Sequence, residues 1–168
     1  MKKYFNKVLL QLIFTVSFLS LANAQVKKEA SVNITGEITK PYVLTLSDFA
    51  KMPRVEIIRK DRDDKDHQYS GVLLTDLLIK AGATMGKELR GNNLTKYVMV
   101  EASDGYRIIF SLAELDPQFS DDKIILTNTM DKKPLPVADG PFRIIVQNET
   151  KPARCIKQVT SIKIGFAK

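Results

Sequence analysis

Short runs of alternating apolar and polar residues dominate this chain, and they predict a protein built mainly of strands. Val32, Ile34 and Gly36 alternate with polar residues over 31–38, which is the period of a half-buried strand. The same reasoning predicts strands at 42–46, 54–59, 97–102, 106–110, 124–127, 142–147 and 160–164. The run at 142–147 is the most continuously apolar, so we expect it at the centre of a sheet.

Helical patterns are few and short. Residues 75–81 form an amphipathic pattern, and Gly82 suits the position just beyond the last turn. Ser47 is the expected N-cap of a second short helix at 48–51. The segment Ser111-Leu-Ala-Glu114 reads as a capping box that starts a third. Because strands outnumber these helices, the predicted class is α+β, a mixed β-sheet with short helices.

Three connecting segments have distinct characters. Ser103-Asp-Gly105 is a strong hairpin signal, because glycine accepts the positive φ that a tight turn needs. Residues 60–67 are dense in charge and read as a solvated loop. Residues 128–141 contain three prolines and form the longest predicted loop, and a loop of that length in a compact domain is usually functional or mobile.

The N-terminus has the layout of a secretory signal peptide. Three lysines by position 7 precede an uncharged apolar run over 8–21, and Ala22-Asn-Ala24 matches the A-x-A cleavage pattern. The apolar run is shorter than the roughly 20 residues that span a bilayer. We therefore expect residues 1–24 to be removed and residues 25–168 to form a single periplasmic or secreted domain with no membrane span after signal cleavage.

Composition is that of an ordinary globular domain, with 44% hydrophobic and 27% charged residues. The formal charge of +7 includes three lysines of the signal segment, which has no acidic residue, so the remainder carries +4. That mild excess forms no concentrated basic face with aromatics, so nucleic acid is not an expected partner. The one cysteine, Cys155, excludes an internal disulfide and is either a buried small apolar side chain or a lone thiol. The one histidine, His67, has no second histidine or cysteine nearby and is not expected to bind metal.

The order of several motifs resembles a known family. Tyr69–Leu78, Ala102–Tyr106, Gly140-Pro-Phe-Arg143 and Lys151-Pro-Ala-Arg154-Cys-Ile-Lys157 follow one another as in the oxidoreductase molybdopterin-binding domain of sulfite-oxidase-type enzymes. The likeness covers nearly all of residues 32–165, in a small stand-alone exported form. It implies the sulfite oxidase molybdopterin-binding-domain-like fold, with molybdopterin as the cofactor.

The resemblance also suggests where a ligand would be held. Arg143 matches the arginine of the family's His-Gly-x-Pro-x-Arg element, and Arg154 and Lys157 match the basic pair of its Ala-Arg-x-x-Lys element. A pterin phosphate carries about two negative charges and favours such groups. These three residues are the predicted cofactor-binding residues. For Arg154 and Lys157, a role as solvent-exposed charges at strand ends is an equal alternative.

Two departures from the family pattern affect the expected chemistry. The family's molybdenum-ligating cysteine follows the third strand, and the corresponding stretch here, residues 55–62, has no cysteine. Molybdenum there requires a soft thiolate, which aliphatic and carboxylate side chains do not supply. The histidine before Gly-x-Pro-x-Arg is replaced by Asp139, an acid that would repel a phosphate.

Two functions follow as hypotheses, and they leave open whether the chain is an enzyme. The first is a non-catalytic exported module that binds a small anionic ligand or a pterin. The second is a molybdopterin-dependent oxidoreductase, or a subunit of one, in the periplasm, with a redox or other periplasmic protein as a candidate partner. A structural protein without a ligand is a third reading. No catalytic residue or metal ligand is assigned from the sequence.

Overall fold

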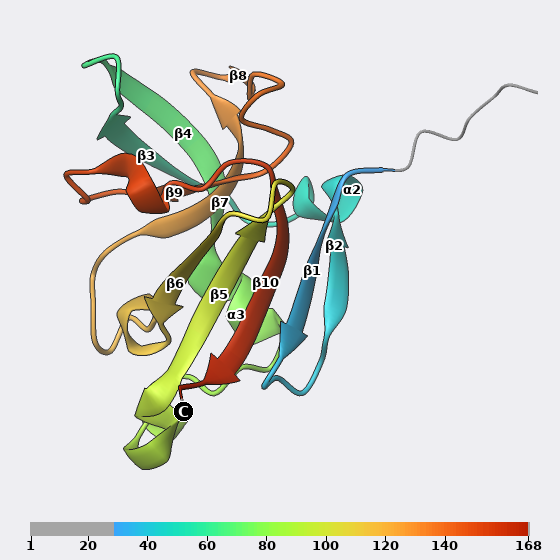
Figure 1. Ribbon diagram of the computed structural model, residues 1–168, viewed down its shortest axis with the longest axis vertical. Helices are drawn as coiled ribbons and strands as arrows, with labels where there is room; N and C mark the ends of the chain where they lie inside the picture. The colour runs from blue at the N-terminus through green and yellow to red at the C-terminus, as the bar shows by residue number, and fades with distance from the viewer. Residues whose placement is uncertain (1–28, 168) are drawn as a thin grey trace, which may run out of the picture.

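The computed structural model describes residues 29–167 and arranges its strands in two five-stranded sheets (Figure 1). The first sheet has the strand order β2 (Tyr42–Thr45), β1 (Ser31–Gly36), β10 (Val159–Phe166), β5 (Lys96–Ala102) and β6 (Arg107–Ser111). Only β1 and β10 pair in parallel, so this sheet is mixed. The expected signal peptide lies outside the described residues.

The second sheet is antiparallel throughout. It contains β3 (Val55–Lys60), β4 (Asp66–Leu73), β7 (Ile124–Met130) and β8 (Lys133–Pro134) in that order, and β9 (Arg143–Val146) pairs with the first half of β7. The α+β class is therefore confirmed, and the strands are divided between two sheets instead of lying in one.

Helices are short and lie at the connections. They comprise α2 (Leu46–Phe49), α3 (Leu74–Lys80) and the 3-10 helices η1 (Gly86–Glu88), η2 (Gly91–Thr95), η3 (Ala113–Leu115) and η4 (Pro152–Arg154). The expected cap at Ser47 is wrong: the side chain of Thr45 accepts the hydrogen bond from the Asp48 N–H. The capping box is confirmed, since Ser111 and Glu114 exchange side-chain to backbone bonds of 2.9 and 3.1 Å. No helix within the described range is long and apolar enough to cross a membrane.

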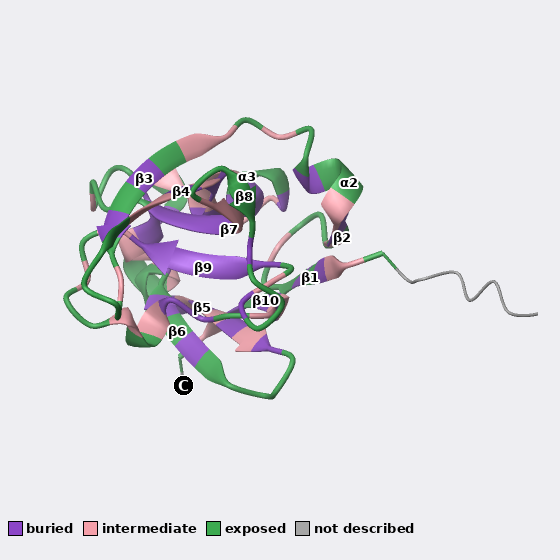
Figure 2. Cartoon of the chain, turned by 90° about the horizontal axis from the view of Figure 1, so that it is seen from above, coloured by how far each residue is buried: buried purple, intermediate pink, exposed green. Residues whose placement is uncertain are grey.

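The apolar strand β9 joins the two sheets, and it is not central as the sequence suggested. Its one ladder partner is β7. Its other edge faces the segment that leads into β10, where Ile144 N–H donates to the Ile156 carbonyl and the Phe142 carbonyl accepts from Val159 N–H. All four residues of β9 are buried, and Figure 2 shows the strand as a continuous buried band. Its apolar sequence therefore reflects burial between two sheets.

Two predicted loops are shorter than expected, because strands extend into them. β7 continues to Met130 and β8 lies within the proline-containing segment, so the hairpin turn there consists of Asp131 and Lys132, both with positive φ. Likewise β4 begins at Asp66, which places His67 in a strand. The β5–β6 hairpin is confirmed, with Gly105 at φ +83°. These turns, with the segments before β9 and β10, surround the candidate site.

Candidate functional site

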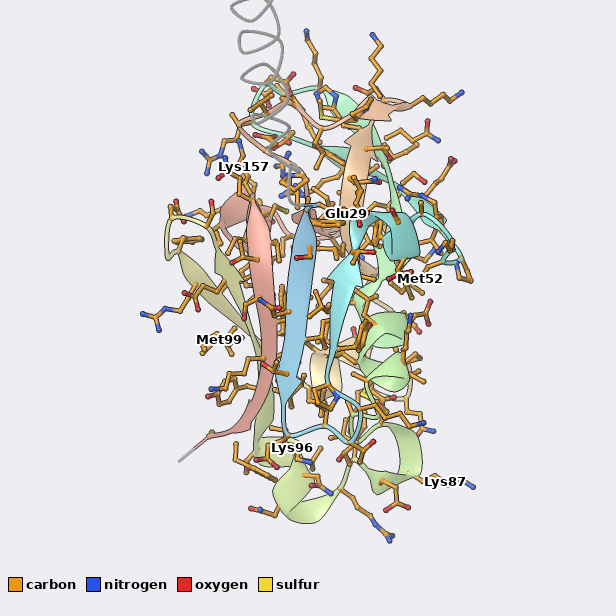
Figure 3. All side chains as sticks on the ribbon, turned by 90° about the vertical axis from the view of Figure 1, so that its right-hand side faces the viewer. Glu29, Met52, Lys87, Lys96, Met99 and Lys157 are labelled. Atoms are coloured by element: carbon orange, nitrogen blue, oxygen red, sulfur yellow. The ribbon has the colours of Figure 1, made fainter. Side chains whose placement is uncertain are left out.

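A pocket of about 590 Å³ opens where two hairpin turns meet the segments that precede β9 and β10. The β3–β4 turn, the β5–β6 turn, residues 139–143 and residues 152–157 supply most of its wall. Figure 3 shows Lys157 at this end of the molecule, with Lys87 and Lys96 at the opposite end. Because the wall comes from segments far apart in the sequence, only the folded chain forms the pocket.

Arg143 is the most buried charged group of the pocket wall, with 5% of its side chain exposed. It is the first residue of β9, and its guanidinium lies between two carboxylates. Its Nη2 donates to Asp61 Oδ2 at 3.0 Å and its Nη1 to Asp139 Oδ2 at 3.1 Å. Nη1 also donates to the Tyr69 hydroxyl at 3.2 Å. The predicted anion-binding arginine is therefore already neutralised by the protein's own acids.

Tyr69 and Asp61 complete this buried cluster. The Tyr69 hydroxyl donates to Asp61 Oδ2 at 2.8 Å, and the Arg143 guanidinium lies 5.5 Å from the centre of the tyrosine ring. Burial opposes ionisation of Asp61, but the Tyr69 hydrogen bond and the Arg143 charge outweigh it and lower the Asp61 pKa to about 2. Burial, followed by the hydrogen bond to Asp61, raises the Tyr69 pKa. Asp61 is therefore a carboxylate at neutral pH and Tyr69 stays protonated.

Lys157 reaches the same cluster from the segment before β10. Its Nζ lies 2.5 Å from Asp139 Oδ1, while Asp139 Oδ2 accepts from Arg143. One carboxylate thus bridges two of the three predicted cofactor-binding residues. The Lys157 side chain is 51% exposed, so its ammonium also faces solvent and can donate further hydrogen bonds.

Arg154 belongs to a different cluster and is not among the pocket-lining residues. Its guanidinium forms ion pairs with Glu149 and, at 3.0 Å, with Glu114. It also lies 4.6 Å from the centre of the Phe110 ring. These contacts tie η4 to η3 and β6. The fold brings Arg143 and Lys157 together and places Arg154 elsewhere.

Sequence reasoning missed Asp61, because it assigned the whole of 60–67 to a solvated loop. That assignment is wrong for Asp61, whose side chain is only 16% exposed. The alternation of the preceding strand could have indicated that Asp61 is buried. Ile57 and Arg59 face inward, and Asp61 is the next residue on that side of the strand. The acid therefore continues the buried face of β3.

His67 was also missed as a site residue, although it lines the pocket. Its Nδ1 lies 2.6 Å from Asp131 Oδ2 and its Nε2 lies 3.0 Å from Asp63 Oδ2. Those two aspartates belong to the β7–β8 and β3–β4 turns, so the imidazole connects the two turns. The hydrogen bond to Asp131 contributes most, and that to Asp63 next, to raising the His67 pKa. Both ring nitrogens are occupied, which leaves neither for a metal.

Cys155 is the only thiol and it touches the pocket, but its chemistry does not match that of a metal ligand. It is 4% exposed, and the Val146 N–H donates to its Sγ at 3.5 Å. Burial raises its pKa, which disfavours the thiolate that metals require. Within residues 29–167, no group of three or more His, Cys, Asp or Glu side chains is placed to hold a metal ion. The expected burial of Cys155 is confirmed.

Comparison with known proteins defines the class to which this fold and pocket belong. Residues 64–166 match the model of the oxidoreductase molybdopterin binding domain, and the chain therefore belongs to that family. Among solved structures, the chain resembles the sulfane dehydrogenase SoxCD from Paracoccus pantotrophus, with a TM-score of 0.64 and 17% identity. That likeness covers 80% of this chain but only 38% of the SoxCD chain, and it shows the shared fold. No curated protein matches.

The residues present do not fit a molybdenum-bearing pterin held in the family's manner. The stretch that should carry the thiolate, residues 55–62, contains Asp61 and no cysteine. The one cysteine of the chain is buried, and burial favours its protonated form. The two cations that should meet the phosphate, Arg143 and Lys157, are bound to Asp61 and Asp139. A dianion would have to compete with those carboxylates for Arg143 and for part of the Lys157 ammonium. The chain therefore has the family's fold, and within its described part the pocket wall contains no cation that is both buried and free of a carboxylate partner.

Proposed function

We propose that this chain is an exported, non-catalytic member of the family, which binds a small anionic ligand or a pterin and does not hold a molybdenum centre. The observation that carries the proposal is the occupation of Arg143 by Asp61 and Asp139 at 3.0 and 3.1 Å. In a catalytic site, that guanidinium would have to be free for the cofactor. Here the protein supplies its own counter-charges, and the scaffold is left with a pocket for another ligand.

The dimensions and wall of the pocket support binding of a small organic molecule. A volume of about 590 Å³ lies in the range of small-molecule sites. Tyr106 is half exposed on the wall, with its hydroxyl donating to the Ala153 carbonyl at 3.1 Å, so its ring is held in place. A fixed aromatic face of this kind suits a flat ring such as a pterin. The solvent-facing side of the Lys157 ammonium offers donors to a single negative group.

The alternative is a molybdopterin-dependent oxidoreductase or a subunit of one. Membership of the molybdopterin-binding family favours it. It requires a metal ligand, and Cys155 is the only thiol that the chain offers. The thiol would have to lose its proton in a buried site, which is the step that its raised pKa opposes.

Cofactor analysis of exported protein separates the two functions. The full chain, with residues 1–24 intact, is produced in a molybdenum-replete bacterial host and recovered from the periplasm or the medium. Molybdenum is measured by mass spectrometry of the metal and pterin by fluorescence after oxidation. We expect folded protein that begins at Gln25 and contains no stoichiometric molybdenum. Ligand binding is then followed through the rise in melting temperature that a native-state ligand must produce.

Cys155→Ser provides the matched variant for that experiment. If wild-type protein contains one molybdenum per chain and Cys155→Ser contains none, the oxidoreductase is the correct reading and the non-catalytic proposal fails. Molybdenum content that is negligible in both proteins supports the binding module. Protein recovered only inside the cell, with residues 1–24 still attached, would contradict export.

A further inference from the structure

We infer that Asp61 and Asp139 are specificity determinants, which exclude ligands bearing a phosphate dianion and restrict the pocket to ligands with at most one negative charge. This inference rests on the proposed function, because it names the charge class of the ligand that the same pocket takes. The sequence suggested that Asp139 repels phosphate, and the structure adds Asp61 and the pairing of both acids with Arg143.

The guanidinium of Arg143 has few N–H groups left for a ligand. Both Nη atoms of Arg143 already donate to protein acceptors, Nη2 to Asp61 and Nη1 to Asp139 and Tyr69. The remaining Nε is buried and has no hydrogen-bond partner. A phosphate recognises arginine through two parallel N–H donors. Nη1 has no N–H left and Nε is buried, so a phosphate can take two donors of Arg143 only by displacing a carboxylate or by reaching the buried Nε.

The second step is the fate of a displaced carboxylate. The side chains of Asp61 and Asp139 are only 16% and 13% exposed. A carboxylate moved off Arg143 would stay in the wall, poorly solvated and close to the incoming phosphate. Removing one partner of a buried ion pair is strongly unfavourable because it leaves an uncompensated charge. Phosphate binding would therefore carry two penalties. One is the cost of breaking the ion pair, and the other is the repulsion between the phosphate and the displaced carboxylate.

The third step is the charge of the remaining wall. Four aspartates and three permanent cations line the pocket, so its fixed charge is slightly negative before His67 is counted. Asp104 is exposed at the wall, where it repels anions, whereas Asp63 pairs with His67 and the exposed Arg62 adds one positive charge. Lys157 keeps a solvent-facing side for one carboxylate-like group. The pocket therefore favours neutral molecules, zwitterions and monoanions.

Titration with inorganic phosphate at constant ionic strength tests this selection. Purified metal-free protein is titrated with phosphate in a calorimeter. In the reference titration, sodium chloride of the same ionic strength replaces the phosphate. We expect no saturable binding by wild-type protein. Asp139→Asn should bind phosphate saturably, with an affinity about tenfold or more above the detection limit that the wild-type titration sets. In that variant Lys157 loses its partner, but Arg143 keeps Asp61 as a counter-charge, so we expect the variant to fold.

Two further variants make the result specific. Glu114→Gln removes the same single negative charge, but from the Arg154 cluster outside the pocket. Glutamine can keep the capping box, so the variant should fold. Its phosphate affinity should equal that of wild type. Asp61→Asn is the second test within the pocket and should also gain affinity. A gain in Glu114→Gln equal to that in Asp139→Asn would mean that net charge alone acts, and it would overturn the inference.

The outcomes distinguish this inference from the proposed function. Saturable phosphate binding by metal-free wild type, as tight as that of Asp139→Asn, overturns the selection while leaving a binding module. Folded Asp139→Asn and Asp61→Asn with no gain overturn it as well. If neither variant folds, the wild-type titration decides by itself, since binding contradicts the inference and its absence supports it. Stoichiometric molybdenum in exported protein would instead overturn the proposed function.

Discussion

At the scale of single residues, the central feature of this protein is a buried salt-bridge cluster around Arg143. Because the Arg143 side chain is almost fully buried, its charge is compensated by Asp61, Asp139 and the Tyr69 hydroxyl instead of by water. A buried ion pair is weak evidence for stability, because its desolvation penalty is comparable to its Coulomb gain. We therefore interpret the cluster as a determinant of what the pocket accepts. Burial raises the pKa of Tyr69, whereas for Asp61 the contacts with Tyr69 and Arg143 outweigh burial and lower the pKa.

His67 yields the clearest prediction at this scale, because it is the only histidine and its NMR titration is unambiguous. Hydrogen bonds that His67 donates to Asp131 and Asp63 raise its folded-state pKa above the ordinary value of about 6.5. The stabilisation that this pairing contributes is fully present below the unfolded-state pKa and is lost as pH rises through the folded-state pKa.

The expected result is a C2-proton titration midpoint above that of a histidine peptide, together with greater resistance to urea at pH 6 than at pH 8. Asp131→Asn should move the midpoint back toward the peptide value, because it removes the partner at 2.6 Å. A midpoint that does not respond to Asp131→Asn would mean that the contact between the two turns does not persist in solution.

At the scale of elements, the close approach of β4 and β7 depends on a glycine. A Cβ built on Gly71 would lie 2.3 Å from the Leu126 carbonyl oxygen of β7, and the pairing of the two strands shifts by a residue between Ser70 and Gly71. Glycine in a strand interior commonly marks such an approach of two backbones. In the sequence, Gly71 was part of a family-like motif, and its physical role became evident only from the pairing.

Gly71→Ala should therefore destabilise the domain strongly, by about 3 kcal/mol, because backbone and not a flexible side chain must move. Gly105→Ala is the matched control: its φ is +83°, but no atom lies within 4 Å of the added Cβ. Conformational strain alone should cost about 1–2 kcal/mol there. Urea denaturation of both variants measures the difference. Equal losses would show that β4 and β7 lie farther apart than described.

At the scale of the whole molecule, the two sheets share one hydrophobic core. Phe142, directly before β9, packs edge-on against Phe49 of α2 with ring centroids 5.2 Å apart, and both are fully buried. The loop segment before β10 bonds to the free edge of β9. Since the pocket wall is assembled from the ends of both sheets, the pocket should exist only while the sheets are joined.

Phe142→Ala tests that coupling. Emptying a fully buried aromatic site should lower the free energy of unfolding by about 3–5 kcal/mol. Far-UV circular dichroism and tyrosine near-UV signals should still change together in urea, because one core unfolds as one unit. Phe119→Ala, at a side chain that is 52% exposed, should alter stability by no more than about 0.5 kcal/mol. Two separate transitions would show that the sheets are independent units.

Local signals in the sequence determined much of this protein. The β5–β6 hairpin, the capping box at Ser111 and the glycine after α3 were predicted because each depends on residues within a few positions of one another. The strand periods also established an α+β class, and the order of motifs indicated the family.

What the tertiary structure alone decided is which distant groups become partners. Asp61 meets Arg143 across 82 positions, and Arg154 turns away from the pocket toward Glu114. β9 is apolar because it lies between two sheets, a contact that no local pattern encodes. The charge of the pocket follows from those long-range pairings.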